Sequence, residues 1–172
     1  FVTGEGYNTS TGAIDCITIK YDSSGNQQWI SSYQAGLRCI GYQVRTDKWG
    51  NCFVTGVGNV GIFTIKYNSD GIQIWNAAYN NTGPESPRKL EIDSSGNIYV
   101  AGISNIGNYY DYITIKYDSS GNELWNRRYN GTANYMDQLT DMKVDKYGNV
   151  SVTGNGTQTG RGYDFTTITY NT

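Results

Sequence analysis

The sequence predicts an all-β fold of short antiparallel strands, and three observations carry this prediction. The 172 residues are poor in charged side chains (16%) and rich in glycine (22) and tyrosine (16), a composition typical of strands joined by many turns. Apolar and polar residues alternate with a period of two, and no segment keeps the 3.6-residue period of a helix. Short motifs also return about every 50 residues, as in repeat architectures.

Two motifs define the repeat. TIKY, or TITY in the last copy, ends at positions separated by 46, 50 and 53 residues: Tyr21, Tyr67, Tyr117 and Tyr170. The motif GN-x-x-V-[TA]-G occupies residues 50–56, 96–102 and 148–154, and a shortened copy, FVTG, occupies residues 1–4. We therefore expect about three and a half repeats within one domain.

Each full repeat contains four predicted strands, bounded by Gly, Asn or Asp. In the best-defined repeat they are KLEID, IYVAG, ITIKY and ELWNRRY. The first repeat lacks its first strand and the last repeat lacks its fourth, so we predict fourteen strands. The repeats divide a single sector into four parts: residues 1–38, 39–84, 85–134 and 135–172.

Four antiparallel strands in about 50 residues match the size of a β-propeller blade. In places the strands carry apolar residues on both faces, as in Ile17, Ile19 and Tyr21 beside Thr18 and Lys20, which suits a blade packed between two neighbours. We therefore predict a β-propeller built from four-stranded antiparallel blades, here about 3.5 blades, which is an incomplete ring by itself.

The stretch LEIDSSGNIYVAG…DYITIKYDSSGNELW resembles the seven-bladed β-propeller repeat family (SBBP-type repeats) of secreted and cell-surface proteins from bacteria and archaea. The matching elements are Asp93–Gly102, Asp111–Tyr117 and Gly121–Trp125, and they recur in the other copies. The resemblance implies an extracellular or cell-surface module and says little about activity. Because a seven-bladed ring needs roughly 350 residues, we expect the partner to be the remainder of a longer propeller chain or a second copy that completes the ring.

An acidic turn of the pattern [DN]-x-x-G closes both hairpins of each repeat. It occurs six times, at Asp22–Gly25, Asp47–Gly50, Asn68–Gly71, Asp93–Gly96, Asp118–Gly121 and Asp145–Gly148. The Asp or Asn oxygen can accept backbone N–H groups, and Gly can adopt the left-handed conformation of a bulged turn. Because a calcium loop needs more carboxylates than one, we interpret the six as structural turns and predict no metal site.

The connections at the opposite ends of the strands vary in sequence, and function tends to lie on such loops. They carry six candidate ligand-binding residues: Tyr7, Tyr109, Tyr110, Tyr135, Arg161 and Tyr163. A tyrosine ring can stack on a sugar or pack against a protein partner. The alternative is that these tyrosines pack the loops onto the sheets.

Three sets of repeated residues are interpreted as structural. They are the Asp before the third strand (Asp15, Asp111, Asp164), the Lys within it (Lys20, Lys66, Lys116) and the Trp of the fourth strand (Trp29, Trp75, Trp125). Catalytic residues are usually unique in a chain, so repetition favours a part in packing, including for Asp a hydrogen bond to a neighbouring blade.

Composition excludes several functions. Histidine is absent, which removes His-dependent triads and zinc sites. A net charge of −2 offers no basic surface for nucleic acid, and no apolar run is long enough to span a membrane. We expect no cofactor. Cys16, Cys39 and Cys52 lack a CxxC pattern and are expected to be buried thiols, with a Cys39–Cys52 bridge left open.

We predict a non-enzymatic structural or binding module of a secreted or cell-surface protein, which presents variable loops on one face. A carbohydrate-binding propeller is the alternative, with the tyrosines stacking on glycans. A glycan-active enzyme is a third hypothesis, for which the non-repeated acids Glu5, Glu85 and Asp137 would have to converge. We assign no catalytic residue.

Overall fold

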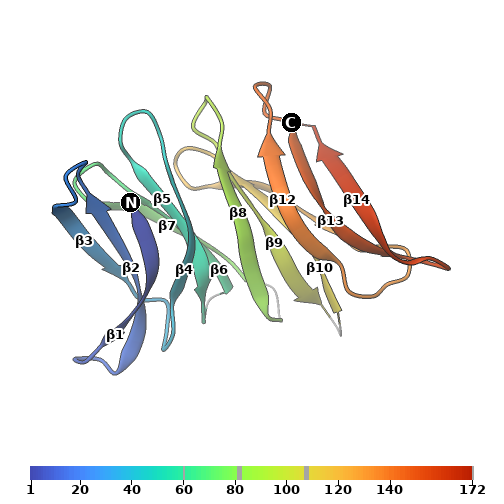
Figure 1. Cartoon of the computed structure of the whole chain (residues 1–172), viewed down its shortest axis with the longest axis horizontal. Coiled ribbons are helices and arrows are strands. Elements are labelled where there is room, and N and C mark those ends of the chain that lie inside the picture. Colours follow the sequence, from blue (N-terminus) through green and yellow to red (C-terminus); the bar gives the residue numbers. More distant parts are fainter. Residues whose placement is uncertain (60, 81–82, 107–108, 172) are drawn as a thin grey trace. The chain divides into compact units, whose positions relative to one another are not determined.

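The computed structural model describes residues 1–59, 61–80, 83–106 and 109–171. These residues form fourteen antiparallel strands in four sheets and contain no helix (Figure 1), which confirms the predicted all-β class. The four sheets are separate from one another, and their arrangement as blades around a common axis remains a prediction. The chain divides into two compact units, Phe1–Asn80 and Asn81–Thr172.

The first unit contains a three-stranded and a four-stranded sheet, each with its strands in chain order. The three-stranded sheet consists of β1 (Val2–Asn8), β2 (Ala13–Tyr21) and β3 (Gln27–Tyr33). The four-stranded sheet consists of β4 (Ile40–Thr46), β5 (Cys52–Gly58), β6 (Gly61–Tyr67) and β7 (Gln73–Tyr79).

The second unit has a four-stranded sheet followed by a three-stranded one. The first consists of β8 (Glu85–Ile92), β9 (Ile98–Ile106), β10 (Tyr109–Tyr117) and β11 (Glu123–Tyr129). The second consists of β12 (Gln138–Val144), β13 (Val150–Gln158) and β14 (Gly162–Tyr170). By repeat position, β4, β8 and β12 are first strands, and we call them inner strands.

The six acidic turns share one geometry. The glycine has a φ of 82° to 87°, which only glycine adopts without strain. The Oδ1 atom of the Asp or Asn accepts the backbone N–H groups two and four residues later, at 2.8–3.0 Å. The side chain therefore holds the hairpin closed from inside the turn.

A second contact inside five of these turns involves the Asn that follows the glycine. Its Nδ2 group donates to the Oδ2 atom of the Asp at 2.7–3.1 Å, in Asn26, Asn51, Asn97, Asn122 and Asn149. The sixth turn begins with Asn68 and has Ile72 at this position. Both oxygens of each Asp are thus occupied within the turn.

Each sheet has two different faces, which we name by the residues they carry. The tryptophan face carries the Trp of the fourth strand, and in three sheets this ring lies beside an aromatic ring of the second strand, in the pairs Phe1–Trp29, Phe53–Trp75 and Tyr99–Trp125. A lysine of the third strand lies over the same second-strand ring: Lys20, Lys66 and Lys116. The opposite, valine face carries the Val of the V-[TA]-G motif.

Within each unit, a tryptophan face packs on a valine face. In the first unit, Trp29 of β3 lies 6.0 Å from the Tyr67 ring of β6, above the buried Val54. In the second unit, Trp125 of β11 lies 5.9 Å from Tyr170 of β14. Since Trp29 corresponds to Trp125 and Tyr67 to Tyr170 in the repeat, the two units use the same packing.

Each inner strand contains a β-bulge at the same repeat position. The register of its pairing shifts by one residue, leaving Tyr42, Arg88 and Thr140 as the extra residues of β4, β8 and β12. Just before each bulge, a backbone carbonyl approaches the glycine of the V-[TA]-G motif. A Cβ atom on Gly56, Gly102 or Gly154 would lie 2.0, 2.2 or 2.1 Å from the carbonyl oxygen of Ile40, Ser86 or Gln138. The motif therefore ends in glycine because the bulged inner strand leaves no room for a side chain.

Candidate functional site

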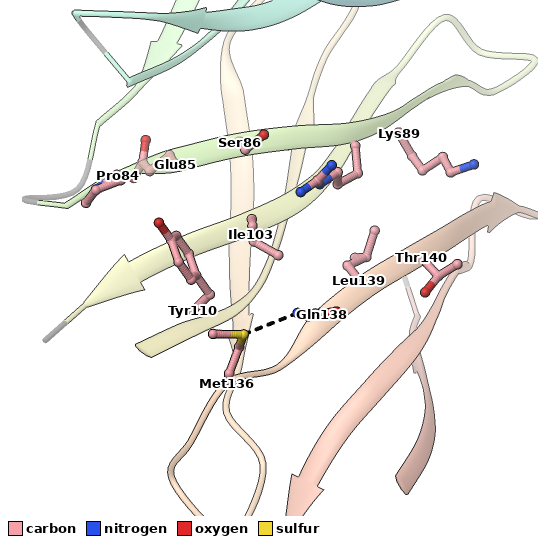
Figure 2. A pocket seen from close by; sticks show the side chains of 11 residues that line it. Pro84, Glu85, Ser86, Lys89, Ile103, Tyr110, Met136, Gln138, Leu139 and Thr140 are labelled. Atoms are coloured by element: carbon pink, nitrogen blue, oxygen red, sulfur yellow. Dashed lines mark hydrogen bonds between the residues drawn. The ribbon is translucent and has the colours of Figure 1, made fainter. Parts of the chain in front are cut away.

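A cavity of about 680 Å³ lies in the second unit, beside the inner strands β8 and β12 (Figure 2). Its volume falls in the range of small-molecule sites. It is lined by Pro84, Glu85, Ser86, Arg88, Lys89, Ile103, Tyr110, Met136, Gln138, Leu139 and Thr140. Strands β8, β9, β10 and β12 and the segment before β12 all contribute, so it draws on both sheets of the unit.

The two bulges supply part of this lining. Arg88 and Thr140, the extra residues of β8 and β12, both border the cavity. A bulge redirects a side chain that regular pairing would place on the other face. Sequence reasoning missed both residues, because the sequence alone does not mark a bulge.

The cavity contains charges of both signs. Glu85 is buried and accepts a hydrogen bond from Ser104 Oγ at 3.4 Å. Lys89 Nζ forms an ion pair with Asp141 Oδ1 at 3.0 Å. Arg88 is exposed and has no ion pair or hydrogen bond with any residue that the structure describes. Its guanidinium group is therefore available to a ligand.

One of the six predicted ligand-binding residues borders this cavity, and two others, Tyr109 and Tyr135, are chain neighbours of lining residues but lie outside the lining. Tyr110 lines the cavity, and Figure 2 shows Met136 and Gln138 beside it, with Gln138 Nε2 donating to Met136 Sδ at 3.2 Å. Next along the chain, the rings of Tyr109 and Tyr135 lie 4.3 Å apart at 47°. The cavity lining therefore combines one aromatic ring with an amide and a guanidinium group.

The other three predicted residues do not line this cavity. Tyr7, 70% exposed, lies near the end of β1 in the first unit. Tyr163 is on β14, and Arg161 precedes that strand and pairs with Asp164 at 3.6 Å. These residues were predicted from the variable loops of the repeat, but the structure does not bring their side chains to one site.

Asp137 fixes the loop that carries Tyr135 and Met136. Its side chain is fully buried, and its carboxylate accepts the backbone N–H groups of Gly131 at 2.6 Å and Thr157 at 2.7 Å. Its own N–H donates to the Tyr110 carbonyl at 2.6 Å. Asp137 is therefore a structural residue that holds Tyr135 and Met136 near β10.

Asp111 lies directly after Tyr110 and forms an ion pair with Arg128 of the adjacent strand β11. Burial raises the pKa of the Asp111 carboxyl to about 6, while the Arg128 guanidinium opposes the rise. Its repeat equivalent Asp15 accepts a bond from Asn8 Nδ2 at 2.8 Å. Both partners lie in the same sheet as the Asp, and not in a neighbouring blade as the sequence had suggested.

The three non-repeated acids each have partners. Glu5 is on the surface of the first unit and pairs with Arg38 at 3.2 Å, whereas Glu85 and Asp137 are engaged as described above. In the described parts of the chain, no three His, Cys, Asp or Glu side chains gather as metal ligands. The cavity lining can recognise a ligand by stacking on Tyr110 and by hydrogen bonds to Gln138 and Arg88.

The cysteines are free, buried thiols. Cys39 shares a hydrogen bond with Cys16, which together with burial raises the Cys39 pKa. The Cys39–Cys52 bridge that the sequence left open is therefore not formed. Burial raises the pKa of Cys52 to about 12, so this thiol stays protonated.

Nowhere in the described residues does a helix occur that could cross a membrane. Neither a known family profile nor a curated protein matches this sequence.

Proposed function

We propose that this chain is a non-enzymatic binding module, a β-propeller sector that holds a ligand cavity beside variable, tyrosine-bearing loops. The observation that carries the proposal is the repeated packing of a tryptophan face on a valine face, through Trp29 and Tyr67 in one unit and Trp125 and Tyr170 in the other. Four-stranded sheets that stack face to face through equivalent residues are the building principle of propellers. A crystal structure with the four sheets arranged around one axis is the expected result, and sheets stacked without a common axis would contradict it.

One further observation supports a binding role without catalysis, and another supports the proposed location of the module. The non-repeated carboxylates Glu5, Glu85 and Asp137 are each tied to protein partners, whereas glycoside hydrolysis needs two carboxyl groups facing each other across a substrate. The resemblance to the propeller repeat family further supports placing the module in a secreted or cell-surface protein, with the rest of a propeller or another protein as partner.

Carbohydrate is the second candidate, and the tyrosine cluster favours it. Tyr110 faces the cavity, and Tyr109 and Tyr135, whose tilted rings lie 4.3 Å apart, immediately precede the lining residues Tyr110 and Met136 in the chain. Sugars present apolar C–H faces that pack on such rings, while their hydroxyl groups can bond with the amide of Gln138 and the guanidinium of Arg88. The cavity would accept a unit of one to a few sugars.

Glycan binding can be tested with an array and three purified proteins. The unmodified chain should bind a defined group of glycans, and Tyr110→Ala should weaken that binding at least tenfold. Tyr163→Ala is the matched control, because Tyr163 is an exposed tyrosine that does not line the cavity. Absence of any bound glycan, or equal loss in both variants, would remove the carbohydrate hypothesis and leave a protein ligand as the candidate.

A further inference from the structure

We propose that the free edge of β1 accepts an added strand that carries the residue pattern of the inner strands. The added strand would pair with β1 as β4, β8 and β12 pair with β5, β9 and β13. The inference goes beyond the proposed function. It rests on the repeat architecture and is independent of any ligand in the cavity.

The strand order identifies the position. β5, β9 and β13 each pair with a strand on both sides, whereas β1, their repeat equivalent, pairs with β2 alone among the described strands. The opposite edge of β1 therefore presents unpaired backbone N–H and C=O groups. Such an edge is a template for strand addition.

Gly4 provides independent support. It is the repeat equivalent of Gly56, Gly102 and Gly154, where an inner-strand carbonyl fills the space of a Cβ atom. At Gly4, by contrast, a Cβ atom would meet nothing within 4 Å. The chain thus has a glycine where no present contact requires one, and the space that the glycine provides is open.

The surface beside this edge is apolar and hollowed. Val2 is 51% exposed, whereas its equivalents Val54, Val100 and Val152 are fully buried. A hollow of about 190 Å³ is lined by Val2, Thr3, Gly4, Glu5, Ile17 and Ile19. In the two packed pairs of sheets, a tryptophan of the neighbouring sheet packs against the cluster that holds the equivalent valine, Trp29 with Val54 and Trp125 with Val152, so the hollow marks an open sheet face next to the free edge.

The paired sheets define the chemistry of the added strand. Opposite the equivalents of Val2 lie Val44, Leu90 and Met142, so the partner must carry an apolar residue there. Three residues later each inner strand is followed by the turn Asp: Asp47, Asp93 and Asp145. A second copy of this chain has β4, β8 and β12 already paired, so we assign the added strand to a segment other than these three that carries the same pattern.

Peptides copied from the chain provide the probe. A fluorescent peptide of residues 85–93, ESPRKLEID, should bind the full chain saturably, as measured by anisotropy, and should slow hydrogen exchange in β1. The same peptide with Leu90→Asp is the control and should bind at least tenfold more weakly. Because a free peptide loses much entropy on binding, a chain with the peptide fused to its N-terminus through a flexible linker is measured as well, and its Tm should rise.

Gly4→Ala tests the position directly. The new methyl group fits the isolated chain, so the Tm of the unfused variant should stay unchanged, but it would collide with the incoming carbonyl. Peptide binding and the Tm gain of the fused chain should therefore be lost. Neither a Tm gain nor β1 protection in the fused chain, or equal gains with and without the Gly4→Ala substitution, would overturn the proposal.

Two further outcomes are informative. If the unfused chain dimerises and Gly4→Ala returns it to a monomer, a second copy supplies the strand from β4, β8 or β12 and this assignment is wrong. Tyr110→Ala should leave peptide binding unchanged, so that failure of the cavity hypothesis and failure of strand addition can be distinguished.

Discussion

At the scale of single residues, the Asp of each turn and the Asn four positions later act as a pair. The Asp oxygens receive two backbone N–H groups and the Asn side chain, as in Asp22 and Asn26. These bonds stabilise the carboxylate and lower the pKa of Asp22. The sequence predicts the roles of Asp and Gly in the turn, but the role of Asn depends on side-chain geometry that a motif does not reveal.

The exceptional turn at Asn68 tests this pairing. Asn68→Asp together with Ile72→Asn should restore the missing side-chain bond and raise the free energy of unfolding by about 0.5 kcal/mol, a modest net value for an exposed hydrogen bond. The two single variants complete a double-mutant cycle in urea denaturation. A coupling energy of zero would show that the Asn–Asp bond contributes nothing to stability.

Asp111 predicts a dependence of stability on pH. Its pKa is about 6 in the folded chain and near 3.8 ordinarily. Between about pH 4 and 6, the folded chain therefore keeps this carboxyl protonated whereas the unfolded chain loses the proton. Stability should therefore fall as pH rises through this window, by up to about 3 kcal/mol. Urea denaturation between pH 4 and 7 measures this. Asp111→Asn should abolish the fall, and a parallel profile in both proteins would contradict the prediction.

At the scale of elements, the strands were predictable and the bulges were not. A period of two and recurring turn residues mark each strand, because alternate side chains face alternate sides of a sheet. A bulge changes register by one residue without altering composition, so Arg88 and Thr140 could not be placed beside Tyr110. The tyrosines show a similar limit, because the sequence did not indicate that Tyr110 would line the cavity while Tyr7 on β1 and Tyr163 on β14 would not.

The bulged pairing makes a prediction for Gly102. A methyl group there would meet the Ser86 carbonyl oxygen at 2.2 Å, so Gly102→Ala should displace β8 and destabilise the chain by about 1–3 kcal/mol. Thermal denaturation followed by circular dichroism measures the loss. The matched control is Gly4→Ala, whose Cβ position is open. Equal stability of the two variants would show that β8 can shift without cost.

At the scale of the whole molecule, two sheet faces differ in a way that matters for solubility. The β12–β14 sheet is three-stranded and carries no tryptophan; on the face that corresponds to the tryptophan face, Ser151 and Thr169 stand where the other sheets have an aromatic residue and a lysine. Ser151 bonds to Thr169 and Thr153 to Thr167, both at 2.9 Å. The same face also exposes Tyr163 and Phe165 of β14, at 57% and 75%, so it combines hydroxyl pairs with exposed aromatic rings.

The valine face of the β1–β3 sheet remains apolar and should dominate any self-association. Ile19 is only partly buried there, whereas its equivalents Ile65 and Ile115 are fully buried. Ile19→Lys should therefore lower both hydrophobic-dye binding and the average mass seen by light scattering at high concentration. Thr167→Lys is the matched control on the β12–β14 sheet, on the face that carries the hydroxyl pairs, and it should change neither dye binding nor the average mass. A larger effect of Thr167→Lys would show that the chain associates through the face that carries the hydroxyl pairs, and it would contradict the prediction.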